Sequence, residues 1–200
     1  MVNNINIGIL GIQGAISEHN TIIQKTLNSS NKVGKISIIT KPKDLEKINA
    51  LVIPGGESTV ISKFLTKTKL NSAIKKKVNK EKIAVMGTCA GAVIISSKIS
   101  NQIKNEIELL DLINIEVERN AFGRQKESFE KKIKIKNFNS PFNAVFIRAP
   151  AITKVGDNID IYAKINKKIV MARKDNILAV SFHPELTNDL RVHKLFLDMI

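Results

Sequence analysis

The sequence is poor in cysteine, aromatic residues and long apolar runs. Its 200 residues contain one cysteine, Cys89, one tyrosine and no tryptophan. A single cysteine excludes an intrachain disulfide and a cysteine-based metal cluster, and it is typical of a reducing, cytoplasmic environment. The most apolar stretch, residues 84–95, is shorter than the roughly 20 residues that span a membrane, and the N-terminal apolar run meets Gln13 and Gly14 too early for a signal peptide. We therefore expect a soluble protein with no membrane partner and no metal.

Acidic residues are fewer than basic ones. The chain has 32 Lys and Arg against 18 Asp and Glu, a formal net charge of +14, which favours an acidic partner such as nucleic acid. Only five of the basic residues are Arg, however, and few aromatic side chains are present to stack on bases. A general bias toward Lys, Asn and Ile explains the charge, so we expect no nucleic-acid partner. We interpret the densest basic cluster, residues 75–77 with Lys80 and Lys82, as a solvated helix face.

Alternating apolar segments predict a single α/β domain over residues 1–200. Strands are predicted at residues 5–10, 33–40 and 50–53, and helical patterns follow the first and the third of them. Such alternation favours a parallel sheet. The last three predicted strands follow one another at hairpin spacing, which predicts an antiparallel extension of that sheet. The later strands are predicted at residues 83–86, 112–118, 129–136, 143–148, 159–163, 169–172 and 178–182.

A glycine-flanked cysteine follows the predicted strand at residues 83–86, in the segment Gly87-Thr88-Cys89-Ala90-Gly91. The two glycines leave room for a tight turn that presents one side chain at the top of a sheet, as in a nucleophile elbow with sulfur in place of oxygen. The start of the following helix favours a thiolate, and its first-turn amides can hold an oxyanion. The alternative is a buried core cysteine without chemistry.

A diglycine loop ends the predicted strand at residues 50–53, in the segment Pro54-Gly55-Gly56-Glu57-Ser58-Thr59. Adjacent glycines let backbone amides approach a ligand closely. In open α/β sheets ligands bind outside the carboxyl ends of the strands, so this loop and the cysteine turn are expected at one edge. The simpler alternative is a turn in which Ser58 or Thr59 caps the next helix, and both interpretations can hold together.

A histidine ends the last predicted strand, in the segment His183-Pro184-Glu185. We expect Pro184 to keep the backbone extended, so that Glu185 lies on the same side as His183 and accepts a hydrogen bond from its ring. Such a carboxylate sets the tautomer and stabilises the imidazolium. The alternative is a structural His-Pro-Glu turn. We interpret His19 and His193, which lie in helical patterns beside charged residues, as surface histidines.

A thiol on an elbow, a paired histidine and a diglycine loop on the same edge form a Cys-His-Glu set with an oxyanion site. Acyl transfer from an amide or ester is the chemistry that this set favours. The acidic residue follows the histidine in this sequence, whereas in α/β-hydrolases the acidic residue comes before the histidine. The order is similar to that of the class I, or triad, glutamine amidotransferases.

Six short motifs spread over nearly the whole chain resemble, in order, those of one family in this class, the glutaminase subunit of pyridoxal 5′-phosphate synthase. The elbow and the His-Pro-Glu segment are shared across the class, and the two motifs that begin at Arg119 and Phe146 are the discriminating ones. Ala92 departs from the family, in which a larger apolar residue is common there. The six motifs are Gly11-Ile12-Gln13-Gly14-Ala15 with Glu18-His19, Pro54-Gly55-Gly56-Glu57-Ser58-Thr59, Gly87-Thr88-Cys89-Ala90-Gly91, Glu118-Arg119-Asn120-Ala121-Phe122-Gly123-Arg124-Gln125, Phe146-Ile147-Arg148-Ala149-Pro150 and Ser181-Phe182-His183-Pro184-Glu185-Leu186-Thr187.

The resemblance implies a fold, an activity and a set of site residues. The fold would have three layers, a mostly parallel central sheet with helices on both faces. Cys89 would be the nucleophile of L-glutamine hydrolysis to glutamate and ammonia through a thioester, with His183 and Glu185 completing the triad. No metal or bound cofactor is implied, and the ammonia would pass to a synthase subunit in a hetero-oligomer. The substrate would be bound by Gly55, Gly56, Glu57, Arg119, Ile147 and Arg148, and the oxyanion by the amides of Gly56 and Ala90.

Two alternative functions follow from other features of the sequence. A glutaminase subunit of another pathway, such as imidazole glycerol phosphate synthesis, would share the elbow and the His-Pro-Glu segment, but the two discriminating motifs argue against it. A Lys-rich nucleic-acid-binding α/β domain would explain the net charge. Its binding would have a steep salt dependence because several phosphates would be contacted.

Overall fold

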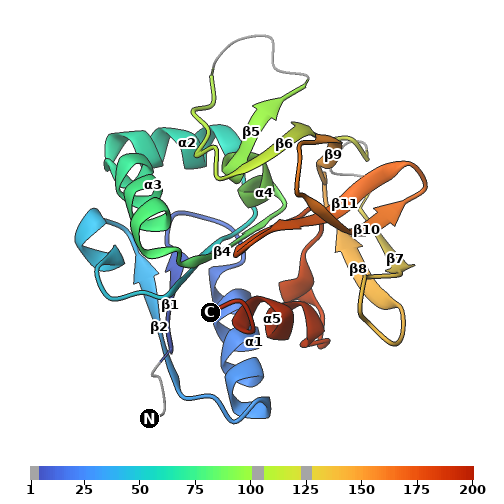
Figure 1. The fold of residues 1–200 in the computed structure, drawn as a ribbon, viewed down its shortest axis with the longest axis horizontal. Helices are drawn as coiled ribbons and strands as arrows, with labels where there is room; N and C mark the ends of the chain where they lie inside the picture. Colours follow the sequence, from blue (N-terminus) through green and yellow to red (C-terminus); the bar gives the residue numbers. More distant parts are fainter. Residues whose placement is uncertain (1–4, 101–105, 123–127) are drawn as a thin grey trace.

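The computed structural model describes residues 5–100, 106–122 and 128–200 (Figure 1). Its main sheet has ten strands in the order β2-β1-β3-β4-β12-β11-β9-β6-β5, with β10 paired to β11. Strands β7 and β8 form a separate antiparallel pair. The strands of the main sheet are β1 (Ile5–Leu10), β2 (Gly34–Ile39), β3 (Ala50–Ile53), β4 (Ala84–Thr88), β5 (Ser96–Ile99), β6 (Ile113–Glu118), β9 (Ala151–Val155), β10 (Asp160–Ile165), β11 (Lys168–Lys174) and β12 (Ile177–Val180). The separate pair is β7 (Phe129–Ile133) and β8 (Phe142–Phe146).

Helices cover both faces of the sheet. Helices α2 and α3 pack on one face with α4, and α1 and α5 pack on the other, where β7 and β8 also lie (Figure 1). Along β3 the side chains alternate between these faces, with Leu51 in the first core cluster and Val52 in the second. Such burial on both sides explains the continuous apolar run of this strand. The helices are α1 (Ile16–Ser29), α2 (Ser58–Lys67), α3 (Leu70–Glu81), α4 (Ala90–Ile95) and α5 (Arg191–Leu197), with short 3-10 turns η1 (Pro42–Leu45) and η3 (Pro184–Leu186).

The topology brings the ends of β3, β4 and β12 to one edge. These three strands are parallel neighbours, with Ile53 opposite Gly87 and Val180 opposite Thr88. The three motifs that follow them in sequence therefore leave the sheet side by side. Strands β10, β11 and β12 pair antiparallel, as their hairpin spacing predicts.

Two strands and one pairing differ from the sequence-based expectations. β5 and β9 are not predicted, because β5 follows α4 with no intervening loop and β9 is recognisable only by its partners β6 and β11. The predicted strands at residues 129–136 and 143–148 pair with each other instead of joining the main sheet. A strand at the edge of the main sheet and a strand of a separate small sheet cannot be told apart in sequence, since both alternate apolar and polar residues.

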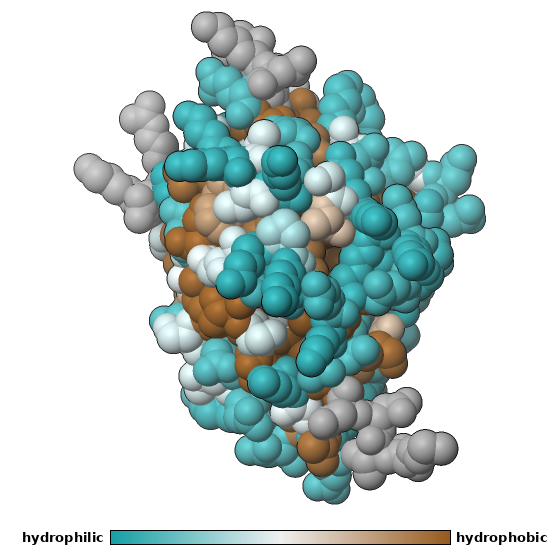
Figure 2. Space-filling model, turned by 90° about the vertical axis from the view of Figure 1, so that its left-hand side faces the viewer, coloured by the Kyte–Doolittle hydropathy of each residue, from teal (hydrophilic) through white to brown (hydrophobic). Residues whose placement is uncertain are grey.

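The interpretation of the basic cluster as a solvated helix face is wrong for Lys77. This side chain is 7% exposed, and its ammonium donates to the Glu46 carbonyl (3.1 Å) and to the Glu81 carboxylate (2.7 Å). Lys77 is buried because α3 packs against η1. Lys76 and Lys80 on the same helix are exposed, and Figure 2, which looks at the side of the molecule that carries α3, shows a largely hydrophilic surface. No helix of the described residues is both long enough and apolar enough to cross a membrane.

Candidate active site

Cys89 occupies a sharp turn between β4 and α4. Its backbone has φ 49° and ψ −110°, a combination that residues other than glycine rarely adopt. A Cβ atom at Gly91 would overlap the carbonyl oxygen of Ile53, and one at Gly87 would overlap the carbonyl of Gly91. The glycines therefore allow α4 to start directly against β3. The strand, turn and helix of a nucleophile elbow are confirmed.

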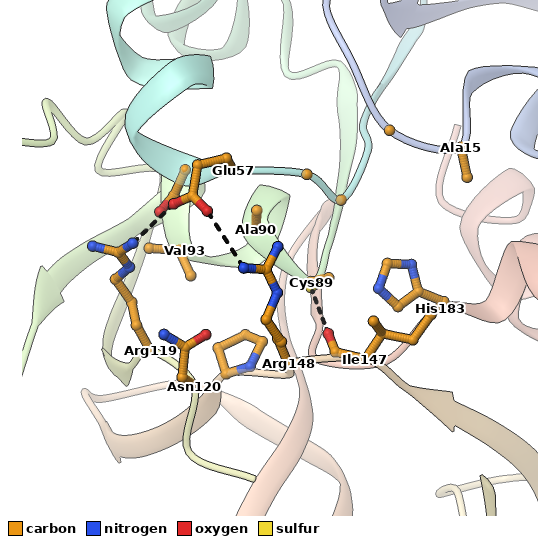
Figure 3. A pocket seen from close by; sticks show the side chains of 15 residues that line it. Ala15, Glu57, Cys89, Ala90, Val93, Arg119, Asn120, Ile147, Arg148 and His183 are labelled. Atoms are coloured by element: carbon orange, nitrogen blue, oxygen red, sulfur yellow. Dashed lines mark hydrogen bonds and ion pairs between the residues drawn. The ribbon is translucent and has the colours of Figure 1, made fainter. Parts of the chain in front are cut away.

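The topology of the sheet places a histidine beside this cysteine. The Cys89 amide donates to the carbonyl of Val180 at the end of β12 (2.8 Å), and His183 follows three residues later. Figure 3 shows the His183 ring next to Cys89, and the thiol of Cys89 donates to the Ile147 carbonyl at 3.7 Å. Cys89 is 7% exposed and His183 is 9% exposed. The thiol is thus largely shielded from water.

Glu185 contacts the imidazole ring of His183. Its Oε1 is 2.7 Å from Nδ1 of His183, so the expected hydrogen bond is present. The expected extended backbone is wrong, because residues Pro184–Leu186 form the 3-10 turn η3. Proline suits the first position of such a turn, since its φ is already close to the helical value. The turn brings the carboxylate back under the imidazole.

Burial and neighbouring charges determine the ionisation of His183 and Glu185. Burial opposes the charge on His183, but hydrogen bonds to Cys89 and Glu185, together with their charges, raise the pKa of His183 to about 10. Burial alone would raise the pKa of Glu185, yet the hydrogen bond and the positive charge of His183 hold it below its ordinary value. At neutral pH the structure thus favours an imidazolium held against a carboxylate.

A pocket opens in front of Cys89, and all the sequence-predicted site residues except Glu185 line it (Figure 3). They come from five separate stretches of chain, the diglycine loop, the elbow, the loop after β6, the loop after β8 and the segment after β12. Sequence reasoning did not place Ala15 or Asn120 at the site, although both belong to the motifs quoted above and line the pocket. The predicted residues in the lining are Gly55, Gly56, Glu57, Cys89, Ala90, Arg119, Ile147, Arg148 and His183.

Glu57 faces two arginines at the end of the pocket away from His183 (Figure 3). Its Oε1 accepts from Arg119 at 3.0 Å, and its Oε2 lies 3.9 Å from the Arg148 guanidinium. Arg148 adopts a positive φ of 45°, a strained conformation of the kind that gathers at binding sites. The arrangement offers a carboxylate and two guanidinium groups to a ligand that carries charges of both signs. The remainder of the Arg119 motif, Gly123-Arg124-Gln125, lies outside the described residues.

The diglycine loop rests on the loop before α1. The Glu57 amide donates to the side-chain oxygen of Gln13 at 2.8 Å. Gly14 has φ 91°, and a Cβ atom there would overlap the Gly55 carbonyl, so the two loops touch backbone to backbone. Helix α2 begins at Ser58 with Glu57 at the N-cap and no side-chain capping bond. The predicted cap by Ser58 or Thr59 is therefore wrong.

His19 and His193 are buried, so their interpretation as surface histidines is also wrong. Both are 0% exposed. Their sequence neighbours Glu18 and Lys194 are charged, which suggested solvent, but α1 and α5 turn the two imidazoles inward against each other and against η3. Among the described residues no group of three or more His, Cys, Asp or Glu side chains is arranged to hold a metal ion.

The chain matches the SNO glutamine amidotransferase family over residues 9–200. It belongs to that family. The match confirms the resemblance found in the sequence motifs, the α/β fold class and the expected glutamine amidotransferase activity. A solved structure described as a glutamine amidotransferase has the same fold, with a TM-score of 0.84 and 36% identity over 96% of this chain and 97% of that one. A second, from Thermotoga maritima, has a TM-score of 0.62 at 13% identity and bears on the fold alone.

Curated relatives match along nearly their whole length. The chain is 44% identical to a protein of Brevibacillus brevis and 40% identical to one of Thermosipho africanus. The matches cover 98% of this chain in both cases, and 97% and 99% of the relatives. Both relatives are named pyridoxal 5′-phosphate synthase subunit PdxT, as is a protein of Nitrosopumilus maritimus that is 42% identical over 97% of this chain.

Gly91→Ala should destabilise the protein, although alanine ordinarily stabilises a helix relative to glycine. The new methyl group would meet the Ile53 carbonyl, so α4 has to move, at a cost of about 1–3 kcal/mol. Denaturant unfolding measures the change. Asn79→Ala on the exposed face of α3 is the matched control and should stay within about 0.5 kcal/mol of the parent. A Gly91→Ala protein as stable as the parent would contradict the packing described for the elbow.

The raised pKa of His183 should make stability depend on pH. The folded protein keeps a proton on His183 up to about pH 10, whereas the unfolded chain releases it near the ordinary value of 6.5. This contribution to the free energy of unfolding is full below pH 6.5 and is lost as the pH rises toward 10. Denaturant unfolding of the parent and of His183→Asn across that interval isolates it, because the lysines titrate in both. Equal pH dependence in the two proteins would refute the assignment.

Proposed function

We propose that the pocket hydrolyses L-glutamine to glutamate and ammonia through a thioester on Cys89. The observation that carries the proposal is the line from Cys89 through His183 to Glu185 at the wall of a pocket that offers both carboxylate and guanidinium groups. The Cys89 thiolate attacks the amide carbon, and His183 passes its proton to the departing ammonia. Water then attacks the thioester as His183 accepts its proton, and glutamate leaves with the Cys89 thiolate and the His183 imidazolium restored. These steps require no metal or bound cofactor.

The backbone amides of Gly56 and Ala90 are proposed to hold the oxyanion. Both residues line the pocket beside Cys89. Ala90 is the first residue of α4, and amides of the first helical turn have no intrahelical acceptor. Donors of this kind stabilise the negative charge that develops on the amide oxygen in the transition state.

The other end of the pocket is proposed to bind the α-amino and α-carboxylate groups of glutamine. Glu57 suits the ammonium, and the guanidinium groups of Arg119 and Arg148 suit the carboxylate or hold Glu57 in place. Ile147 completes the wall, and its carbonyl accepts from the Cys89 thiol. A substrate lacking either α-group would leave one of these charges unmatched, which favours free glutamine over a simple amide.

The proposed recipient of the ammonia is a synthase subunit that builds pyridoxal 5′-phosphate. Three relatives that match over almost the whole chain are named as subunits of that synthase. Ammonia released into water at neutral pH is protonated and loses its nucleophilicity, so hydrolysis is useful only when a receiving protein is docked. We further propose a cytoplasmic setting, in which the single thiol stays reduced. Neither a role in imidazole glycerol phosphate synthesis nor nucleic-acid binding is favoured by any observation on the site.

Cys89→Ala and Cys89→Ser should abolish glutamine hydrolysis and leave the fold intact, because each removes the only thiol. The release of glutamate is measured with the synthase present, and circular dichroism reports the fold. A diazoketone analogue of glutamine should add to the parent and to neither variant in intact-mass spectra. Ser72→Ala on the outside of α3 is the control and should keep full activity. A Cys89 variant that retains more than a small fraction of the rate would exclude the thioester route.

The glutaminase rate should rise when the synthase subunit is titrated in. The Gln13 and Gly14 backbone contacts the diglycine loop directly, so a partner that covers this edge can adjust the oxyanion site. The rate is followed as a function of partner concentration at saturating glutamine, with an unrelated protein as the control. A rate already maximal without the synthase, or no stimulation at saturation, would rule out this gating while leaving the hydrolysis itself in place.

A further inference from the structure

A chain of buried polar side chains continues behind the Cys-His-Glu set. Glu185 is 5% exposed, and one of its oxygens, Oε1, is bound by His183. Its other oxygen, Oε2, has no hydrogen bond in the described part of the chain, and Nε2 of His19 lies 3.4 Å from it. A buried carboxylate oxygen without a donor costs free energy. His19 is the group placed to supply that donor.

The His19 ring contacts two further elements, β4 and α5. Its Nε2 lies 3.2 Å from the hydroxyl oxygen of Thr88, the residue before Cys89. Its Nδ1 lies 3.4 Å from Nε2 of His193 on α5. Its backbone amide donates to the carbonyl of Ala15, which lines the pocket. The imidazole therefore joins α1, β4, η3 and α5 at one point behind the site.

The hydrogen-bond partners determine where the protons lie. Nδ1 of His193 is buried and has no partner among the described residues, so a proton there would be an unmatched donor. The His193 proton is therefore on Nε2, from which it is donated to Nδ1 of His19. The proton of His19 is then on Nε2, facing Glu185 and Thr88. The Nε2–H groups of His193 and His19 thus both point along this row of side chains toward the Glu185 carboxylate.

The charges around His19 agree with a neutral ring. Burial lowers the pKa of His19 and the positive charge of His183 adds to this, whereas Glu185 and the exposed Glu18 act in the opposite direction. Burial is the main cause that lowers the pKa of His193 to about 3. Both imidazoles can therefore donate hydrogen bonds without bringing a second positive charge next to His183.

We propose that His19 is a positioning residue, whose Nε2–H holds Glu185 ionised and oriented toward His183 and so ties the start of α1 to the catalytic set. The proposal deepens the function proposed above and rests on it. Without the donor, burial would raise the pKa of Glu185. The carboxylate would then become protonated at a higher pH, and the imidazolium of His183 would lose its counter-ion there.

The first experiment compares His19→Leu with His19→Gln in the complex with the synthase. Leucine fills space without a donor, and the glutamine amide can donate where Nε2 does. His19→Leu should lower kcat about 10- to 100-fold with KM little changed, and the acid limb of the pH profile should move up by about one pH unit. His19→Gln should restore both. An unshifted acid limb in His19→Leu, or equal impairment of the two variants, would overturn the proposal.

The second experiment needs neither a variant nor glutamine hydrolysis. Nitrogen-15 NMR of the histidines in the parent protein should show His19 and His193 neutral, protonated at Nε2, and without titration between about pH 5.5 and 9. A proton on Nδ1 of His19, or a charged His19 near neutral pH, would overturn the proposal even if His19→Leu failed to fold. If the parent hydrolysed no glutamine, the function proposed above would fail, while this spectrum would still judge the role of His19.

Discussion

The site depends on the backbone turn at Cys89. A residue other than glycine in this conformation costs on the order of 1–3 kcal/mol, and the packing around it holds it there. All six residues of α4 are buried, and Gly91 brings the helix against the Ile53 carbonyl. If the helix moved away from β3, the thiol would leave both the pocket and His183. The strain at Cys89 is thus maintained by the core of the domain.

Charges inside the site are matched locally, although the protein as a whole is strongly basic. His183 is paired with Glu185, and Glu57 faces two arginines. The excess of lysine lies elsewhere, on surfaces such as the outer face of α3, and takes no part in these pairs. A net charge of +14 therefore says little about the ligand, because the field in a buried pocket is set by the nearest groups.

Local patterns predicted the backbone geometry at Cys89 and the diglycine loop well, and the packing around them poorly. The elbow and the diglycine loop carry their geometry in adjacent residues, since glycine permits the close approach that each needs. The 3-10 turn at Pro184 was missed because proline is compatible with both extended and helical backbone. Lys77 was misjudged for a different reason. A helix pattern shows which face is polar but not whether another element, here η1, covers that face.

The sequence by itself determined the family, the α/β alternation and the identities of the three residues proposed to act on the substrate, because short-range geometry and motif order carry that information. Only the tertiary structure decided that His19 and His193 lie behind Glu185. Their contacts join His19 to Thr88 and to His193, which are far apart in the chain, and burial depends on how α1 and α5 pack together beside η3. A histidine looks the same in sequence whether its ring meets water or a buried carboxylate. The difference arises from packing between elements, which no local pattern records.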